Sequence, residues 1–340
     1  MTHAQPIRYT DDLEVALPDE DEVVAEIVEM MRRSMGRAFD EHRQIASGTH
    51  AETHGVVTGR FTVDDDLPPE LAQGLFARPR SDEAVLRYSS EPGVLETDTI
   101  PGGASLKVLD VSGETLRPGW TSQDFLFNTW PIIPPGDAIA YRNLIRERSG
   151  QVEALTEELT ELGLFDRTPN ISPVAHFYYT QGAFRYGDHV AKLCLAPVSA
   201  EQREAGNREV NSEDGPGVLS ALTREYYATN AARYELRAQL CIDIAAVPVE
   251  DAAVPWDEQV SPYRRVAILE IPPQESFSPA RRAYAERVMS YRPWYGLVAH
   301  QPLGSINRLR RDLYSTLGAW RHDTHATPEH DPTSLSEIPD

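Results

Sequence analysis

The chain has 340 residues, of which 41% are hydrophobic, enough for one large domain or two ordinary ones. Its formal net charge of −21 argues against nucleic acid or an anionic membrane as a main partner. Because no apolar run is long enough to span a bilayer and residues 1–17 lack the pattern of a signal peptide, we expect a soluble cytoplasmic protein.

The N-terminal part of the sequence predicts a flexible start followed by one helix. Residues 1–17 are polar and show no periodicity. A run of acidic residues, 19–22, then precedes apolar residues at helical spacing, and acidic side chains stabilise the positive end of a helix dipole. The apolar positions are Val24, Ile27, Val28, Met31 and Met35.

Short strand-like segments follow, separated by Gly and Pro. They are residues 55–63, 84–89, 105–111, 124–127, 189–195, 235–243 and 265–271. Two predicted helices, 137–148 and 151–164, interrupt them, and a polar loop, 200–217, precedes a further helix. Because the strands come in runs rather than in strict alternation with helices, we predict an α+β fold, an antiparallel β-barrel with appended helices.

The last predicted helix, residues 305–325, carries a polar row beside an apolar stripe. The stripe consists of Leu309, Leu313 and Leu317. Arg310 and Tyr314 are four residues apart and share a face, and Arg321 follows two turns later. An arginine beside a phenol favours the phenolate, and tyrosine is a known ligand of haem iron. The same spacing is also typical of a surface helix with a half-buried tyrosine.

Two histidines are the remaining candidates for chemistry, while the two cysteines are assigned none. His50, at the mouth of the first predicted strand, could take a proton from a peroxide and return it to the leaving oxygen if it faces a cavity. The alternatives are a hydrogen-bonded loop histidine and, with His54 four residues on, a metal pair, for which no third ligand is nearby. Cys194 and Cys241 lie in apolar strand-like segments and are predicted to be buried thiols rather than a disulfide.

Several sequence blocks occur in the order found in a known family. They are Thr49-His50-Ala51 with Gly55, Gly59 and Phe61; Arg87-Tyr88-Ser89; Gly103-Ala104-Ser105-Leu106-Lys107; Asp124-Phe125-Leu126-Phe127-Asn128 with Pro131-Ile132; Arg185-Tyr186-Gly187-Asp188-His189-Val190-Ala191-Lys192; Pro302-Leu303-Gly304-Ser305-Ile306-Asn307-Arg308; and Arg310, Tyr314 and Arg321. Together they resemble the catalase superfamily, and the resemblance covers about residues 42–322. The resemblance is greater to its short bacterial branch of catalase-related haem peroxidases, akin to the coral allene oxide synthase domain.

The resemblance implies haem b as the cofactor. Tyr314 would be the axial ligand of the iron, and Arg310 would keep the phenol ionised. His50, with Thr49 before it, would be the distal acid-base catalyst.

The resemblance also implies the remaining contacts. Arg87 and Arg321 would bind the haem propionates, since the planar arginine fork suits a carboxylate. Asn128 would hydrogen-bond the peroxide, although the spacing to the following proline also allows Thr129 to take that place. The family's arginine three residues before the distal histidine is replaced by Ser47, so one propionate contact departs from the pattern.

Composition and the resemblance together predict a flexible N-terminus (1–17), a catalase-like haem domain (18–325) and a disordered tail (326–340). Its expected activity is the reduction or rearrangement of hydrogen peroxide or organic hydroperoxides, with an organic reductant as a further partner and a homodimer allowed. The alternative from another class is a catalase-fold barrel that has lost haem and acts as a binding protein. A non-haem oxidoreductase is the weakest reading, because no facial-triad spacing occurs.

Overall fold

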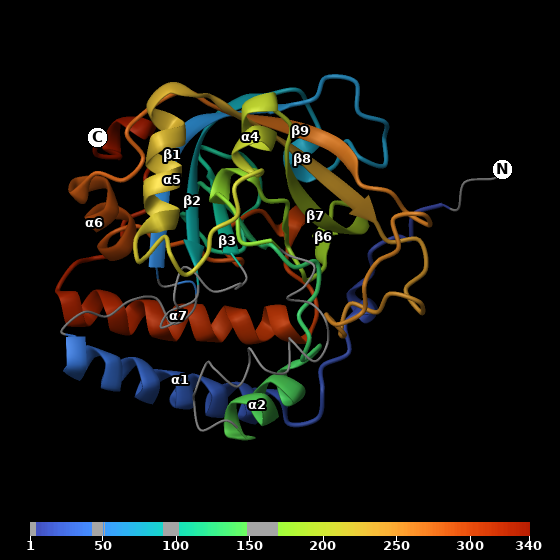
Figure 1. The fold of residues 1–340 in the computed structure, drawn as a ribbon. Helices are drawn as coiled ribbons and strands as arrows, with labels where there is room; N and C mark the ends of the chain where they lie inside the picture. Colours follow the sequence, from blue (N-terminus) through green and yellow to red (C-terminus); the bar gives the residue numbers. More distant parts are fainter. Residues whose placement is uncertain (1–4, 43–49, 51, 91–101, 148–168) are drawn as a thin grey trace.

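A closed antiparallel barrel forms the centre of the molecule. The computed structural model describes residues 5–42, 50, 52–90, 102–147 and 169–340. Eight strands close the ring in the order β5, β4, β3, β2, β1, β9, β8, β7, with β7 pairing β5 again, and a short strand, β6, also pairs with β7 (Figure 1). The strands are β1 (Glu52–Val63), β2 (Ser81–Ser90), β3 (Gly102–Val108), β4 (Gln123–Asn128), β5 (Tyr178–Tyr179), β6 (Phe184–Tyr186), β7 (His189–Pro197), β8 (Ala232–Leu240) and β9 (Arg264–Ile271). The predicted antiparallel barrel is confirmed.

Alternating side chains explain why the barrel has one core. In β8, Leu236 and Ala238 point into the interior and are fully buried. Glu235 and Arg237 point outward and form an ion pair of 2.6 Å. Successive strand residues face opposite sides of a sheet, so this period of two fills the interior with apolar groups and leaves charges outside.

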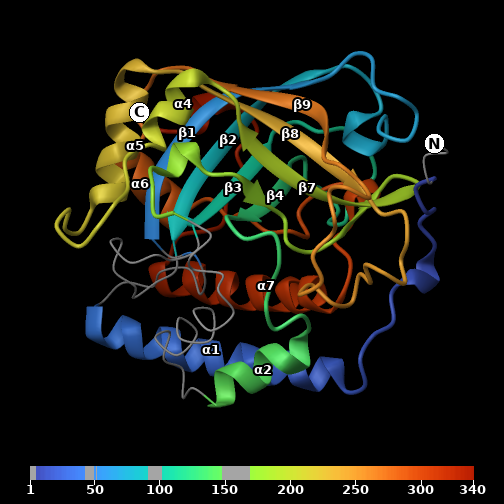
Figure 2. The ribbon, with the colours of Figure 1, turned by 45° about the vertical axis from the view of Figure 1, so that its right-hand side comes forward.

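Helices cover the barrel and add a layer below it. They are α1 (Glu20–His42), α2 (Ala138–Glu147), α4 (Ala200–Ala205), α5 (Val218–Thr229), α6 (Pro279–Arg287) and α7 (Ser305–His325). Short 3-10 helices span Asp11–Leu13, Gly74–Phe76, Pro173–Ala175, Val298–His300 and Leu335–Glu337. Figures 1 and 2 show α7 running between the barrel and the pair α1 and α2. Among the described residues, no helix combines the length and the apolar character needed to cross a membrane.

The leucine stripe of α7 holds this lower layer together. Its three leucines are buried in one cluster with α1, whose contributions include Val23, Val24 and Ile27. Burying an aliphatic side chain of this size contributes roughly 1.5–3 kcal/mol. The polar row of α7 is thereby turned toward the barrel.

The loop and cysteine predictions have mixed outcomes. Within the predicted polar loop, 200–217, the structure has helix α4, which starts with a capping box between Ser199 and Gln202. Cys194 and Cys241 are both free and buried, as predicted. The predicted helix at 151–164 lies outside the described residues.

Both terminal segments pack against the barrel where they are described, in contrast to the flexibility expected for them. Near the N-terminus, the Ile7 amide donates to the Cys241 carbonyl at 2.9 Å. In the C-terminal segment, 326–340, Asp331 pairs at 2.8 Å with the fully buried Lys107, and Ile338 is buried. A buried ammonium needs nearby carboxylates, which is a long-range requirement that local composition does not reveal.

Candidate functional site

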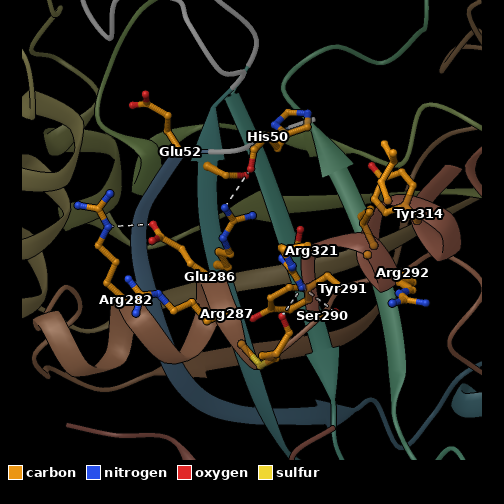
Figure 3. Close-up of a pocket in the computed structure, with 18 of the residues that line it drawn as sticks. His50, Glu52, Arg282, Glu286, Arg287, Ser290, Tyr291, Arg292, Tyr314 and Arg321 are labelled. Atoms are coloured by element: carbon orange, nitrogen blue, oxygen red, sulfur yellow. Dashed lines mark hydrogen bonds and ion pairs between the residues drawn. The ribbon is translucent and has the colours of Figure 1, made fainter. Parts of the chain in front are cut away.

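A cavity of about 460 Å³ lies between α7 and the strands above it, with α6 along one side (Figure 3). Six of the seven predicted site residues line it: His50, Arg87, Asn128, Arg310, Tyr314 and Arg321. The seventh, Thr49, lies outside the described residues. The volume is in the range of roughly 300–1,000 Å³ found for small-molecule and cofactor sites.

His50 is held in an unusual backbone conformation at the cavity wall. Its φ of 48° is in the left-handed region, which costs free energy for a residue with a Cβ. Its carbonyl accepts a hydrogen bond of 2.9 Å from Arg87, which also donates to the Thr53 hydroxyl at 3.0 Å. The imidazole packs over Gly103, where an added Cβ would stand 2.3 Å from Nδ1. Glycine at 103 is therefore required for this position of the ring.

Asn128 lies beside His50. The amide nitrogen of Asn128 is 3.4 Å from Nε2 of His50, and the amide oxygen accepts from the Trp130 backbone N–H at 2.9 Å. That bond orients the amide so that its nitrogen faces the histidine. Thr129 instead accepts from the Gly102 N–H at 3.1 Å and does not line the cavity. Of the two candidates for a distal amide or hydroxyl, the geometry favours Asn128.

Tyr314 and Arg310 approach the cavity from α7, as the helical spacing predicted. Tyr314 is half-buried and lines the cavity. The hydrogen bonds of Arg310 run to Asn307 Oδ1 at 3.3 Å and Gln181 Oε1 at 3.2 Å rather than to the phenol. Gln181 has a φ of 63° and donates to the Ile132 carbonyl at 2.7 Å, so a strained residue from another segment positions this guanidinium.

Arg321 is a largely buried cation. Burial, and then the neighbouring charges of Arg87 and Arg292, lowers its pKa to about 10. Its Nη2 donates to the Met289 carbonyl at 3.2 Å and to the Ser290 hydroxyl at 2.9 Å. Its Nε is buried without a hydrogen-bond partner among the described residues, and Arg321 forms no ion pair with any carboxylate of those residues. A buried cation in this state suits an anionic ligand.

Sequence reasoning missed several residues of the wall, which are Ser89, Gln181, Ser290, Tyr291 and Arg292. Ser89 lies in a recognised block and had a sequence signal. The segment 289–292 had none, because its place is set by contacts such as the 2.8 Å ion pair between Arg292 and Glu329 of the C-terminal segment. His54 does not line the cavity and is buried, 2.7 Å from the Ser90 hydroxyl.

No protein-family model matches the sequence, and no curated protein sequence matches it. The structure is similar to solved catalases. A fungal catalase has a TM-score of 0.62 at 15% identity, over 87% of this chain and 65% of that one. Catalase A from Saccharomyces cerevisiae has a TM-score of 0.59 at 15% identity, over 87% and 67% of the two chains. A bacterial catalase has a TM-score of 0.58 at 13% identity, over 84% and 58%.

The similarity extends over 84–87% of this chain. The chain spans less than two thirds of the fungal and bacterial catalases that it matches. At this sequence identity the similarity establishes architecture and leaves activity to be argued from the site. The chain therefore has a catalase-like fold, an antiparallel β-barrel with appended helices.

Proposed function

We propose that the chain is a haem-dependent oxidoreductase of the catalase or peroxidase type, with haem b bound in the cavity. One observation carries the proposal. The His50 imidazole and the Asn128 amide line the cavity on its barrel side, and the Tyr314 phenol lines it on its α7 side (Figure 3 labels His50 and Tyr314). These are the side chains that peroxide chemistry at a tyrosine-bound haem requires.

The donors around the cavity fit this cofactor. Tyr314 would bind the iron through its phenolic oxygen, and Arg87 and Arg321 would bind the two propionates. The unsatisfied Nε of Arg321 supports the assignment, since a buried donor without a partner costs about 1–3 kcal/mol that an anionic ligand nearby reduces. Bound haem supplies the redox chemistry with peroxide.

The residues of the chain move the proton and orient the substrate. His50 Nε2 would accept the proton of a peroxide and return it to the departing oxygen. The Asn128 amide nitrogen, fixed by the Trp130 N–H on its other side, would donate a hydrogen bond to the peroxide. Phe127 lines the same wall and would keep bulk water from the distal side.

We further propose membership of the short catalase-related peroxidase branch, a cytoplasmic location and a homodimer. The Thr49-His50 pair and the ordered sequence blocks support the branch. In this branch the substrates would be hydrogen peroxide or organic hydroperoxides, with an organic reductant completing a peroxidase cycle. The net charge of −21 supports a soluble partner rather than a polyanion.

Titration of the purified protein with haemin tests the proposal. We expect one equivalent to bind with a Soret band, and the complex to consume hydrogen peroxide or cumene hydroperoxide. A folded protein that binds no haemin would contradict the proposal and favour the alternative, a barrel that acts only as a binding protein.

A further inference from the structure

Arg321 contacts two side chains, Ser290 and His322, that have no role in the proposed chemistry. We infer that Ser290 and His322 are positioning residues that hold the Arg321 guanidinium in place for an anionic ligand in the cavity. The inference rests on the proposed function for the identity of that ligand, a carboxylate of haem. It concerns residues outside the blocks that resemble catalases.

The three side chains form a compact hydrogen-bonded group. Nη2 of Arg321 is 2.9 Å from the Ser290 hydroxyl and 3.1 Å from Nε2 of His322, and the hydroxyl is 3.1 Å from the same nitrogen (Figure 3 draws Arg321 and Ser290). Ser290 and His322 are each only 7% exposed. The group joins the end of α7 to the 289–292 segment of the cavity wall.

The bonds are consistent with one protonation state. Nδ1 of His322 lies 2.9 Å from the Thr327 carbonyl, which can only accept, so Nδ1 carries the proton. Nε2 is then an acceptor in the neutral ring and takes the Ser290 O–H. The Ser290 oxygen in turn accepts from Arg321. A chain of donation therefore runs from Arg321 through Ser290 and His322 to Thr327.

This arrangement determines which part of Arg321 the ligand meets. All hydrogen bonds of the guanidinium within the described residues leave from Nη2. Nε and Nη1 are thereby left for a ligand in the cavity that Arg321 lines. Like charges on Arg87 and Arg292 disfavour a cation at this point, so without the Ser290 and His322 acceptors the guanidinium would be pushed from its position.

Two substitutions of His322 form a matched pair. His322→Gln can place an amide oxygen near the position of Nε2 and so keep an acceptor for Ser290 and Arg321. His322→Asn can keep the donor to Thr327 but removes that acceptor. We expect the haem-loaded His322→Asn protein to transfer haem to apomyoglobin at least about tenfold faster than the wild type, and His322→Gln to stay near the wild-type rate. Ser290→Ala should behave like His322→Asn and serves in its place if that variant does not fold.

The pH dependence of haem transfer is the second readout. The charged groups that act on His322 are Arg321, Arg292 and Glu329, and burial followed by the charge of Arg321 lowers its pKa. Protonation at low pH turns Nε2 into a donor that faces Ser290 and Arg321. We expect wild-type haem transfer to accelerate as the pH falls and His322→Gln to show a flatter profile.

The outcomes separate the two claims. A wild-type chain that binds no haem overturns the proposed function and this inference together. A wild-type chain that binds haem while His322→Asn and His322→Gln release it at equal rates overturns the inference alone. Thermal unfolding of the haem-free variants checks that the fold is intact.

Discussion

Nε2 of His50 lies 3.4 Å from the amide nitrogen of Asn128, although the two residues are 78 positions apart in the chain. The barrel creates this contact, because Asn128 ends β4 opposite Gly103 in β3, and the imidazole of His50 packs over that glycine. The proposed distal pair thus depends on strand register as much as on the two side chains themselves. Substitutions at Asn128 and at Gly103 test that dependence.

Replacing Asn128 by alanine should slow the reaction of the haem-loaded protein with hydrogen peroxide on the order of 100-fold, because a donor to the reacting oxygen is lost. Stopped-flow absorbance at the Soret band measures the rate. Thr129→Val is the matched control, since Thr129 bonds the Gly102 N–H and does not line the cavity. Equal slowing in both variants would show that the Asn128 amide has no special role.

Gly103→Ala should displace the His50 imidazole while leaving haem bound. The added methyl would stand 2.3 Å from Nδ1, whereas a methyl at the neighbouring Gly102 would meet, within the part of the chain that the structure describes, only the Thr129 methyl, at 3.3 Å. We expect the peroxide reaction to slow at least about tenfold in Gly103→Ala and little in Gly102→Ala. An unchanged rate in Gly103→Ala would mean that His50 does not transfer the proton.

Asp331→Ala should destabilise the fold, because it removes one of the two carboxylates paired with the buried Lys107. The free energy of unfolding should fall by roughly 1–3 kcal/mol, with Asp124 still paired to the ammonium. Urea denaturation measures the change. Asp323→Ala, at an exposed position of α7, should cost less than about 0.5 kcal/mol. A similar small cost for Asp331→Ala would indicate that the C-terminal segment does not hold the barrel.

The stability of the fold should decrease in mild acid. Burial, followed by the charge of Arg87, lowers the pKa of His54 to about 3, and burial lowers that of His300 to about 4. In the unfolded chain each titrates near pH 6.5, so unfolding takes up protons below that pH. The contribution of these histidines to the free energy of unfolding is therefore greatest above about pH 6.5. It declines as the pH falls, by up to about 1.4 kcal/mol per pH unit for each histidine.

His300→Leu separates this effect from the titration of carboxylates. The variant loses the acceptor of the Leu75 N–H and is expected to be less stable at every pH. Its unfolding free energy should nevertheless depend less steeply on pH between about 4.5 and 6.5, because unfolding of the variant takes up close to one proton fewer than unfolding of the wild type. Urea denaturation across that range gives the slope, and a slope equal to that of the wild type would contradict the assignment.

The barrel was predictable where a local pattern exists. The alternation of polar and apolar residues along β8 and the apolar runs in β7 and β9 predict strands, because side chains on a pleated strand alternate between core and solvent. Strand β5 is different. It has only two residues, Tyr178–Tyr179, yet it closes the ring by pairing with both β4 and β7. No period can be read from two residues, so closure depended on tertiary structure.

The residues of the candidate site were likewise predictable only where a local pattern exists. Arg310, Tyr314 and Arg321 could be placed on one face of α7 because helical spacing determines which side chains are neighbours. Gln181 and Ser290 could not, since each meets α7 through a contact between segments far apart in the chain. The expected contact between Arg310 and the phenol illustrates the limit: the spacing permits it, but Gln181 and Asn307 take the hydrogen bonds.

The most direct test of the central claim is the visible spectrum of the haem-loaded protein with and without the phenol of Tyr314. Tyr314→Phe removes the proposed iron ligand, and Tyr9→Phe, at a tyrosine that does not line the cavity and packs in a different cluster, is the matched control. We predict that the wild type and Tyr9→Phe show the same ferric spectrum of an oxygen-ligated haem, and that Tyr314→Phe loses it or fails to retain haem. An unchanged haem spectrum in a folded Tyr314→Phe protein would contradict the account.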